Sequence, residues 1–178
     1  MILGVHSATF VKNWHEDVKP YIHLCKKAGY KSVEVSLLGQ TPSSAKEIAK
    51  LANDLNISIT CTTGLSNEED ISSSDPVIQQ NGVDALKRAI DMTAIMQAKL
   101  LTGVVHAAWG ISNSMGKDKE GKFQNSSHSI KKITSFLSEK NIKLGIEPLN
   151  RYESDFINTV DEGIRLCELI DHPNVGLL

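Results

Sequence analysis

The stretch KLGIEPLNRYE, from Lys143 to Glu153, decides the fold because an apolar strand ends in it on a charged side chain. The run from Leu144 to Ile146 has the composition of a buried strand, and Glu147 follows it directly. An isolated charge at the end of a buried strand is costly unless a partner offsets it. The polar residues that crowd behind Glu147 therefore point to a functional site at this strand end.

The same succession of amphipathic helix, polar break and apolar strand recurs along the whole chain. Five helical stretches separate six expected strands, which lie near residues 2–6, 32–36, 57–62, 99–105, 143–147 and 174–178. The strands are runs of apolar residues rather than strict alternations, as expected when both faces of a sheet are covered. This alternation predicts right-handed βαβ units and a parallel sheet.

Two architectures with parallel sheets compete. A doubly wound nucleotide-binding sheet requires a glycine-rich turn after its first strand, and GVHSATFVKNW (residues 4–14) contains none. A (β/α)8 TIM barrel instead places polar, reactive side chains at the carboxyl ends of many strands. The chain offers such side chains at its expected strand ends, namely His6, Glu34, Thr62, Thr63, His106 and Glu147. The barrel is the favoured interpretation.

The expected barrel is incomplete. A TIM barrel has eight strands and typically about 250 residues, whereas this chain has 178 residues. The last five residues, NVGLL, read as the beginning of a sixth strand. We expect residues 1–178 to form a single domain of about five and a half βα units, the N-terminal two-thirds of a TIM barrel truncated within its sixth strand.

Composition excludes several classes of partner. The chain has 19 basic and 21 acidic residues and only 5% aromatic residues, so it lacks the basic face and the stacking surface that nucleic acids require. No apolar stretch approaches the roughly 20 residues that span a bilayer. The cysteines Cys25, Cys61 and Cys167 show no paired spacing and predict reduced thiols. We expect a cytoplasmic protein that binds neither nucleic acid nor membrane.

Two interpretations stay open for Glu147. It either forms an ion pair with Arg151 at the strand end, or it ligates a divalent cation or acts as a general base. Glu153 lies in the following loop, where solvent exposure and a role in the site are equally open. Thr159 or its neighbour Asn158 is expected to cap the helix that follows.

Other strand ends supply further candidates. Glu34 either orients a neighbouring group or contacts a substrate, and His6 and His106 are either structural or part of the same pocket. Trp14 and Trp109 follow the first and fourth strands, where they either cap the core or form a pocket wall. Aromatic faces in such a place suit the C–H faces of a sugar.

Two polar segments look like connections. SNEEDISSSD (residues 66–75) is expected to face water and to end in the helix cap Asp75, with Pro76 as the first helical residue. NSMGKDKEGKFQNSSH (residues 113–128) is expected to be a mobile, lid-like connection.

Several motifs of the chain resemble one known family. They are IEPLNRYE (146–153), NTVDEG (158–163), HPNVGLL (172–178), SVEVS (32–36), TTGLS (62–66) and GVVHAAWG (103–110). Together they resemble the D-tagatose/D-psicose (D-allulose) 3-epimerases, which belong to the xylose isomerase-like superfamily of sugar phosphate isomerases and epimerases with a TIM barrel. IEPLNRYE is fairly specific to the ketose 3-epimerase branch, whereas SVEVS and TTGLS mark only the superfamily.

The resemblance implies roles for individual residues. In that family Mn2+, Mg2+ or Co2+ is held by Glu, Asp, His and Glu, and Glu147 matches the first ligand, which is also one of two catalytic carboxylates. The remaining ligands are expected beyond Leu178. Glu153 would hydrogen-bond the sugar near its reacting end, and the family often carries an aromatic residue where His6 stands. The resemblance implies that Trp14 and Trp109 line the substrate pocket. Together with the candidates at the strand ends, the residues expected to bind substrate are Glu153, His6, Trp14, Trp109, His106, Glu34, Thr63 and Gly64.

The implied function is that of a metal-dependent isomerase that epimerises a ketose at C3 through an enediolate, with the full-length protein a homo-oligomer. The residues alone leave alternatives open. Within the superfamily these are hydroxypyruvate isomerisation, inosose dehydration and epimerisation of a pentulose phosphate. Outside catalysis the alternative is a sugar-binding fragment of a barrel. The 178-residue chain by itself is expected to be inactive.

Overall fold

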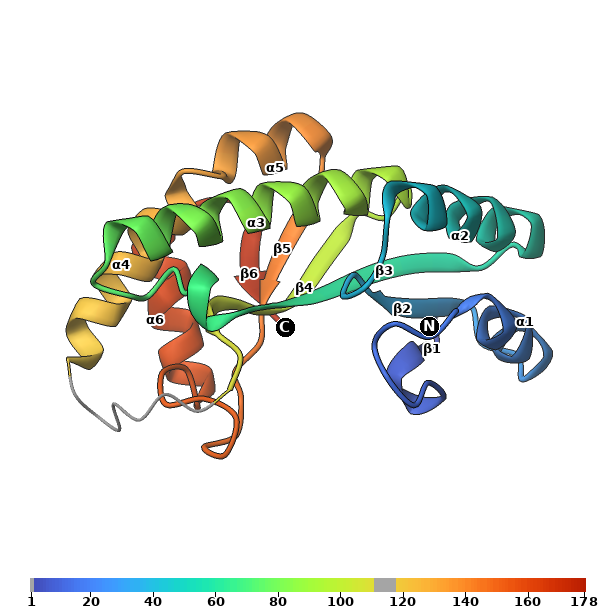
Figure 1. Cartoon of the computed structure of the whole chain (residues 1–178), viewed down its shortest axis with the longest axis horizontal. Coiled ribbons are helices and arrows are strands. Elements are labelled where there is room, and N and C mark those ends of the chain that lie inside the picture. Colours follow the sequence, from blue (N-terminus) through green and yellow to red (C-terminus); the bar gives the residue numbers. More distant parts are fainter. Residues whose placement is uncertain (1, 111–117) are drawn as a thin grey trace.

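The computed structural model describes residues 2–110 and 118–178 and contains one parallel sheet (Figure 1). The strands lie side by side in the order β1-β2-β3-β4-β5-β6, so each strand pairs with the one before it in the chain. Their bounds are Gly4–His6 (β1), Ser32–Ser36 (β2), Ser58–Leu65 (β3), Leu100–Ala108 (β4), Lys143–Ile146 (β5) and Val175–Leu177 (β6).

This consecutive order distinguishes the two architectures. A doubly wound sheet reverses its strand order at a switch point, whereas a barrel adds each new strand on the same side of the previous one. All five pairings, from β1 with β2 to β5 with β6, are parallel and follow the barrel order. The barrel prediction is confirmed, and six strands make it incomplete against the eight of a closed barrel.

The helices form an outer layer around the sheet (Figure 1). Their bounds are Lys19–Lys27 (α1), Pro42–Leu55 (α2), Pro76–Ile95 (α3), Lys119–Lys131 (α4), Thr134–Lys140 (α5) and Val160–Ile170 (α6), with short 3-10 turns at Ser7–Thr9 (η1) and Asn67–Glu69 (η2). In the part of the chain that is described, no helix is both long enough and apolar enough to cross a bilayer.

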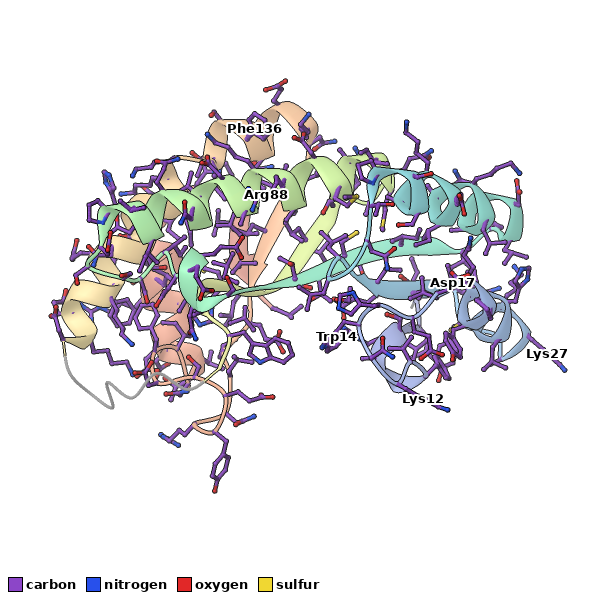
Figure 2. All side chains as sticks on the ribbon, in the orientation of Figure 1. Lys12, Trp14, Asp17, Lys27, Arg88 and Phe136 are labelled. Carbon is purple, nitrogen blue, oxygen red and sulfur yellow. The ribbon has the colours of Figure 1, made fainter. Side chains whose placement is uncertain are left out.

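The core lies between this helical layer and the sheet. Ile22 of α1, Ile48 of α2 and Leu86 of α3 are buried against strand residues such as Val35 and Leu101. Charged side chains such as Lys12 and Lys27 point away from the body of the molecule (Figure 2). Among the cysteines, Cys25 and Cys61 are buried, Cys167 is half-buried, and all three are free thiols, as expected.

Helix starts agree with the local sequence signals. Asp75 caps α3 by accepting a 2.8 Å hydrogen bond from the Val77 amide, and Pro76 is the first helical residue, as predicted. Thr159 caps α6 by accepting from the Glu162 amide at 3.2 Å, while the Glu162 carboxylate accepts from the Thr159 amide. This reciprocal capping box fixes where the loop after β5 ends.

The segment after β4 differs from expectation. Residues 113–128 were expected to be a mobile connection, and its part from residue 113 to 117 lies outside the described residues. From Lys119 the chain is helical, so α4 occupies most of the segment that was expected to be a connection, and a short break before Thr134 separates it from α5. Ser126 and Ser129 are buried on α4 and donate to the carbonyls of His106 and Ile71.

Replacing Thr159 by alanine removes the side-chain half of the α6 cap. We expect Thr159→Ala to lower the free energy of unfolding of the intact protein by about 1 kcal/mol, because one amide of the first turn loses its acceptor. Thr159→Ser keeps the hydroxyl and is the matched control. Urea denaturation measures both, and equal stabilities for the two variants would contradict the capping role.

Candidate active site

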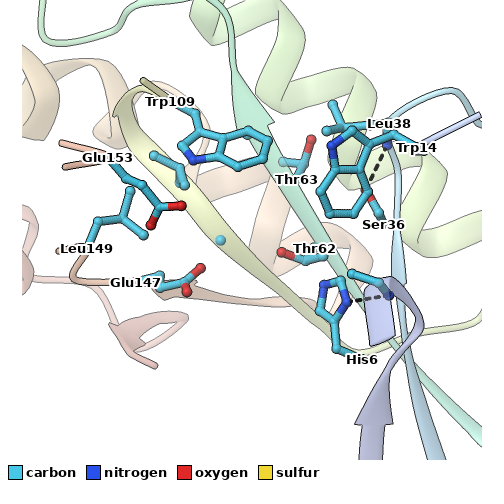
Figure 3. Close-up of a pocket in the computed structure, with 14 residues that line it drawn as sticks. His6, Trp14, Ser36, Leu38, Thr62, Thr63, Trp109, Glu147, Leu149 and Glu153 are labelled. Atoms are coloured by element: carbon cyan, nitrogen blue, oxygen red, sulfur yellow. Dashed lines mark hydrogen bonds between the residues drawn. The ribbon is translucent and has the colours of Figure 1, made fainter. Parts of the chain in front are cut away.

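A pocket of about 270 Å³ opens at the carboxyl ends of the strands (Figure 3). Side chains from β1, β2, β3, β4 and the loop after β5 meet there although they are far apart in the chain. The lining residues are His6, Ala8, Trp14, Ser36, Leu38, Thr62, Thr63, Gly64, Gly103, Val104, Trp109, Glu147, Leu149 and Glu153. The pocket has room for a small organic molecule.

Most of the residues expected to form a site line this pocket. Trp14, Thr63 and Trp109 lie on one part of its wall, and Glu147 and Glu153 lie together on another, with His6 across from them (Figure 3). Gly64 also lines the pocket, next to Trp109. Glu34 and His106 do not line it. The geometry therefore brings together seven of the nine expected residues, which are His6, Trp14, Thr63, Gly64, Trp109, Glu147 and Glu153.

Glu147 is the pocket carboxylate that no described residue engages. Among residues 2–110 and 118–178 no hydrogen bond or ion pair reaches its side chain, and the alternative ion pair with Arg151, whose side chain is exposed, is not present. Burial, followed by the negative charges of Glu34 and Glu153, raises the pKa of Glu147, and His6 opposes that shift. Such a group is a better proton acceptor than an exposed carboxylate.

Glu153 is held in place by its own loop. Its Oε2 accepts a 2.7 Å hydrogen bond from Asn150 Nδ2, and its carbonyl accepts a 3.1 Å bond from the Gly110 amide. The second bond ties the loop after β5 to the loop after β4. Glu153 is therefore a positioned carboxylate at the pocket wall rather than an exposed one.

The two tryptophans meet at the pocket. The rings of Trp14 and Trp109 pack edge to face with centroids 5.9 Å apart, and Trp14 also packs edge to face with His6 at 6.3 Å. Trp109 lies against β3 at Gly64, where an added Cβ would stand 3.3 Å from the Trp109 ring. Gly64 thus leaves the space that the indole occupies, and the two indoles form an apolar wall.

Glu34 lies next to the pocket, between His6 and Thr102. Parallel pairing places it beside His6, because the two residues are register partners on β1 and β2. Glu34 Oε1 accepts a 2.7 Å hydrogen bond from Thr102 Oγ1, and its Oε2 is 3.8 Å from His6 Nε2. His6 Nδ1 accepts a 2.8 Å bond from the Ala8 amide. Glu34 therefore lies beside one pocket residue, His6, without lining the pocket itself.

His106 does not line the pocket and packs against Phe156 instead. It is fully buried, its ring packs against Phe156 at 5.8 Å, and neither ring nitrogen has a hydrogen-bond partner among the described residues. Burial lowers the pKa of His106 from 6.5 to about 3, so the imidazole is neutral. Its place at a strand end did not predict the direction of its side chain.

The pocket also contains residues that were not expected there. Ser36 and Leu38 follow Glu34 with the alternation of a strand, which is the signal that would have placed Ser36 on the same face. Thr62 was noted as a strand-end residue without a role assigned to it. Leu149 and Ala8 carry no signal in the sequence, because their positions depend on how the loops fold.

A metal site is only partly provided. Within the described ranges no three His, Cys, Asp or Glu side chains come together closely enough to hold a metal ion. The unpaired Glu147 carboxylate that faces the pocket has the donor chemistry of a ligand for a hard divalent cation. The described residues thus supply one ligand of such a site, Glu147.

Comparison with known proteins gives concordant results. A family model described as xylose isomerase-like TIM barrel matches residues 22–178. The chain is 28% identical to a D-psicose 3-epimerase of Ruminiclostridium cellulolyticum over 98% of its own length and 61% of the relative's. It is also 28% identical to a D-psicose 3-epimerase of Agrobacterium fabrum, over 98% of its own length and 62% of the relative's.

A solved structure is similar over almost the whole chain. The crystal structure of a D-psicose 3-epimerase in the presence of D-fructose superposes with a TM-score of 0.92 at 27% identity. That match covers 99% of this chain and 62% of the other. The chain therefore spans a little over three-fifths of the length of the relatives it matches.

The buried imidazole of His106 predicts a pH-dependent stability. As pH falls below 6.5, the unfolded chain binds a proton at this residue that the folded chain does not bind until about pH 3. Folding stability is therefore lost as pH falls through this range, by about 2 kcal/mol between pH 7 and pH 5.

We expect His106→Phe to remove this share of the pH dependence when the intact protein is unfolded in urea at several pH values. The exposed His23→Gln is the control, and it should keep the slope of the unchanged protein. A slope that His106→Phe leaves unaltered would show that the imidazole is not held neutral.

Proposed function

The chain belongs to the xylose isomerase-like TIM-barrel family, and on that premise we propose that it is part of an enzyme that epimerises a ketose at C3. The named 3-epimerases among its relatives support the choice within the family. Because the chain spans 61% of the first of these relatives, the activity is proposed for the intact protein. Residues 1–178 would be the N-terminal part of its single barrel domain.

One observation carries the proposal: Glu147 is a desolvated, unpaired carboxylate that faces a pocket of the size of a sugar. The hydrogen on a carbon next to a ketone is weakly acidic, and its removal requires a base held within hydrogen-bond reach. The raised pKa of Glu147 brings its basicity closer to neutral pH, where proton transfer in both directions is efficient.

The other pocket residues would orient the sugar. The indole wall of Trp14 and Trp109 suits the C–H face of a monosaccharide and excludes water from it. Glu153, fixed by Asn150, would accept a hydrogen bond from a sugar hydroxyl near Glu147. In the free pocket its charge contributes to the raised pKa of Glu147.

Epimerisation requires a second proton-transfer group on the opposite face of the carbon. Glu147 supplies one face, and we assign the second group to the part of the intact protein outside residues 1–178. On this proposal Glu147 removes the proton from C3, the enediolate forms, and the second group returns a proton from the other side. Residues 1–178 alone would therefore lack turnover.

The intact enzyme would use a divalent cation, with Mn2+, Mg2+ or Co2+ as candidates. Glu147 is the residue of this chain that would hold it, together with ligands from elsewhere in the protein. When bound, such an ion stabilises the negative charge that develops on neighbouring oxygen atoms. The three free thiols support a reducing, cytoplasmic location for the protein.

Replacing Glu147 by glutamine tests the proposal. We expect Glu147→Gln in the intact protein to lower kcat at least about a thousandfold for interconversion of D-fructose and D-psicose, because the amide accepts no proton. D-tagatose is a further substrate to assay. Glu139→Gln, on the exposed face of α5, is the control and should keep full activity. Retained turnover in Glu147→Gln would refute the role of this residue.

The proposed metal dependence can be tested separately from the role of Glu147 in turnover. Removal of divalent ions by a chelator should abolish activity, and added Mn2+ should restore it. Mn2+ should also raise the melting temperature of the intact protein, because a ligand that binds only the folded state stabilises it. In Glu147→Gln this thermal shift should shrink markedly. A shift of unchanged size would place the ion elsewhere.

A further inference from the structure

His6 presents a defined hydrogen-bond donor to the pocket. The Ala8 amide donates to His6 Nδ1 over 2.8 Å, so in the neutral imidazole Nδ1 is the acceptor and the proton resides on Nε2. This contact is also the side-chain cap of η1, which fixes the ring relative to the backbone. The tautomer therefore follows from a backbone contact rather than from solvent.

The Nε2–H group remains available to a ligand. The carboxylate oxygen Glu34 Oε2 is 3.8 Å from Nε2, which is beyond hydrogen-bond distance. No other hydrogen bond engages Nε2 among the residues that the structure describes. His6 lines the pocket with a third of its side chain exposed, on the side across from Glu147 (Figure 3).

Glu34 is anchored so that it can hold this imidazole. Its Oε1 accepts from Thr102 Oγ1 at 2.7 Å, across the intervening strand β3, so the carboxylate cannot turn toward the pocket without losing that bond. Its other oxygen stays beside the ring because His6 and Glu34 are register partners. At this distance the carboxylate attracts the Nε2–H group electrostatically but does not form a hydrogen bond with it, so the group can still donate to a ligand.

We propose that His6 is a specificity-determining residue, whose Nε2–H donates a hydrogen bond to a hydroxyl oxygen at the end of the sugar remote from Glu147, and that Glu34 is the residue that positions it. This inference rests on the proposed function for the identity of the ligand as a ketose. It assigns Glu34 a role through His6 rather than a contact with substrate.

Two substitutions separate the donor from the cap. Asparagine at position 6 can accept from the Ala8 amide and so keeps the cap, but it places no donor where Nε2 lies. Glutamine places an amide N–H near the Nε2 position and gives up the cap. If His6 acts as the donor, His6→Gln is the mild variant; if it acts only as a cap, His6→Asn is the mild one.

We expect His6→Asn in the intact protein to raise KM for D-psicose about tenfold, the equivalent of one neutral hydrogen bond, with little change in kcat. His6→Gln should stay within about threefold of the unchanged protein in KM. For a ketopentose, whose chain is one carbon shorter, the two variants should differ little. The reverse order of the variants, or an equal loss for both sugars, would overturn the donor role.

The positioning role of Glu34 is tested by a double-mutant cycle. Glu34→Gln keeps the acceptor for Thr102 and removes the charge beside His6. It should raise KM in the presence of His6 and leave KM unchanged in the His6→Asn background, because residues that act as one unit are not additive. Any change in kcat that arises from the lost negative charge near Glu147 should appear in both backgrounds. Effects that add would contradict the positioning role.

Two measurements do not depend on turnover. Nitrogen-15 spectra of the labelled imidazole, in mildly alkaline buffer where histidine is neutral, should show Nε2 protonated and Nδ1 unprotonated; the opposite tautomer would overturn the inference. Calorimetric binding of D-psicose should follow the same order of variants. Binding without exchange at C3 would refute the proposed function alone, whereas absence of binding to the unchanged protein would refute both.

Discussion

Consecutive parallel pairing is the constraint on which the rest of this molecule depends. Because each strand is added beside its predecessor in the same direction, all carboxyl ends meet at one rim. Residues separated by more than a hundred positions, such as His6 and Glu147, thereby face the same small space. The register adds a finer constraint, since it pairs His6 with Glu34 and fixes the faces on which their side chains lie.

That convergence brings negatively charged side chains close together, and neighbouring groups stabilise some of these charges but not all of them. Three carboxylates lie at or near the pocket, and the charges of Glu34 and Glu153 raise the cost of ionising Glu147. Glu34 is offset by Thr102 and His6, and Glu153 by Asn150. Glu147 receives no such support from the described residues, and its pKa is raised. The carboxylate left without a partner is the one to which we assign the chemistry.

The sequence predicts those features of the fold that depend on local patterns of residues. Strand positions, the caps at Asp75 and Thr159, and the convergence of strand ends follow from apolar runs, capping residues and the barrel rule. His106 was misplaced because the pairing of β3 with β4 shifts register between Gly64 and Leu65, which breaks the alternation that a sequence can show. The start of α4 was missed because three of its buried residues are serines, which leaves only Phe123 and Ile130 as buried apolar positions.

Trp14 and Trp109 are the two tryptophans of this chain, and both stand at the pocket. Their ultraviolet emission therefore originates next to the candidate site and not in the core between sheet and helices. The edge-to-face contact, at 5.9 Å between ring centroids, joins loops that follow strands β1 and β4. Within residues 1–178, the wavelength and intensity of tryptophan fluorescence therefore report whether these two loops are in contact.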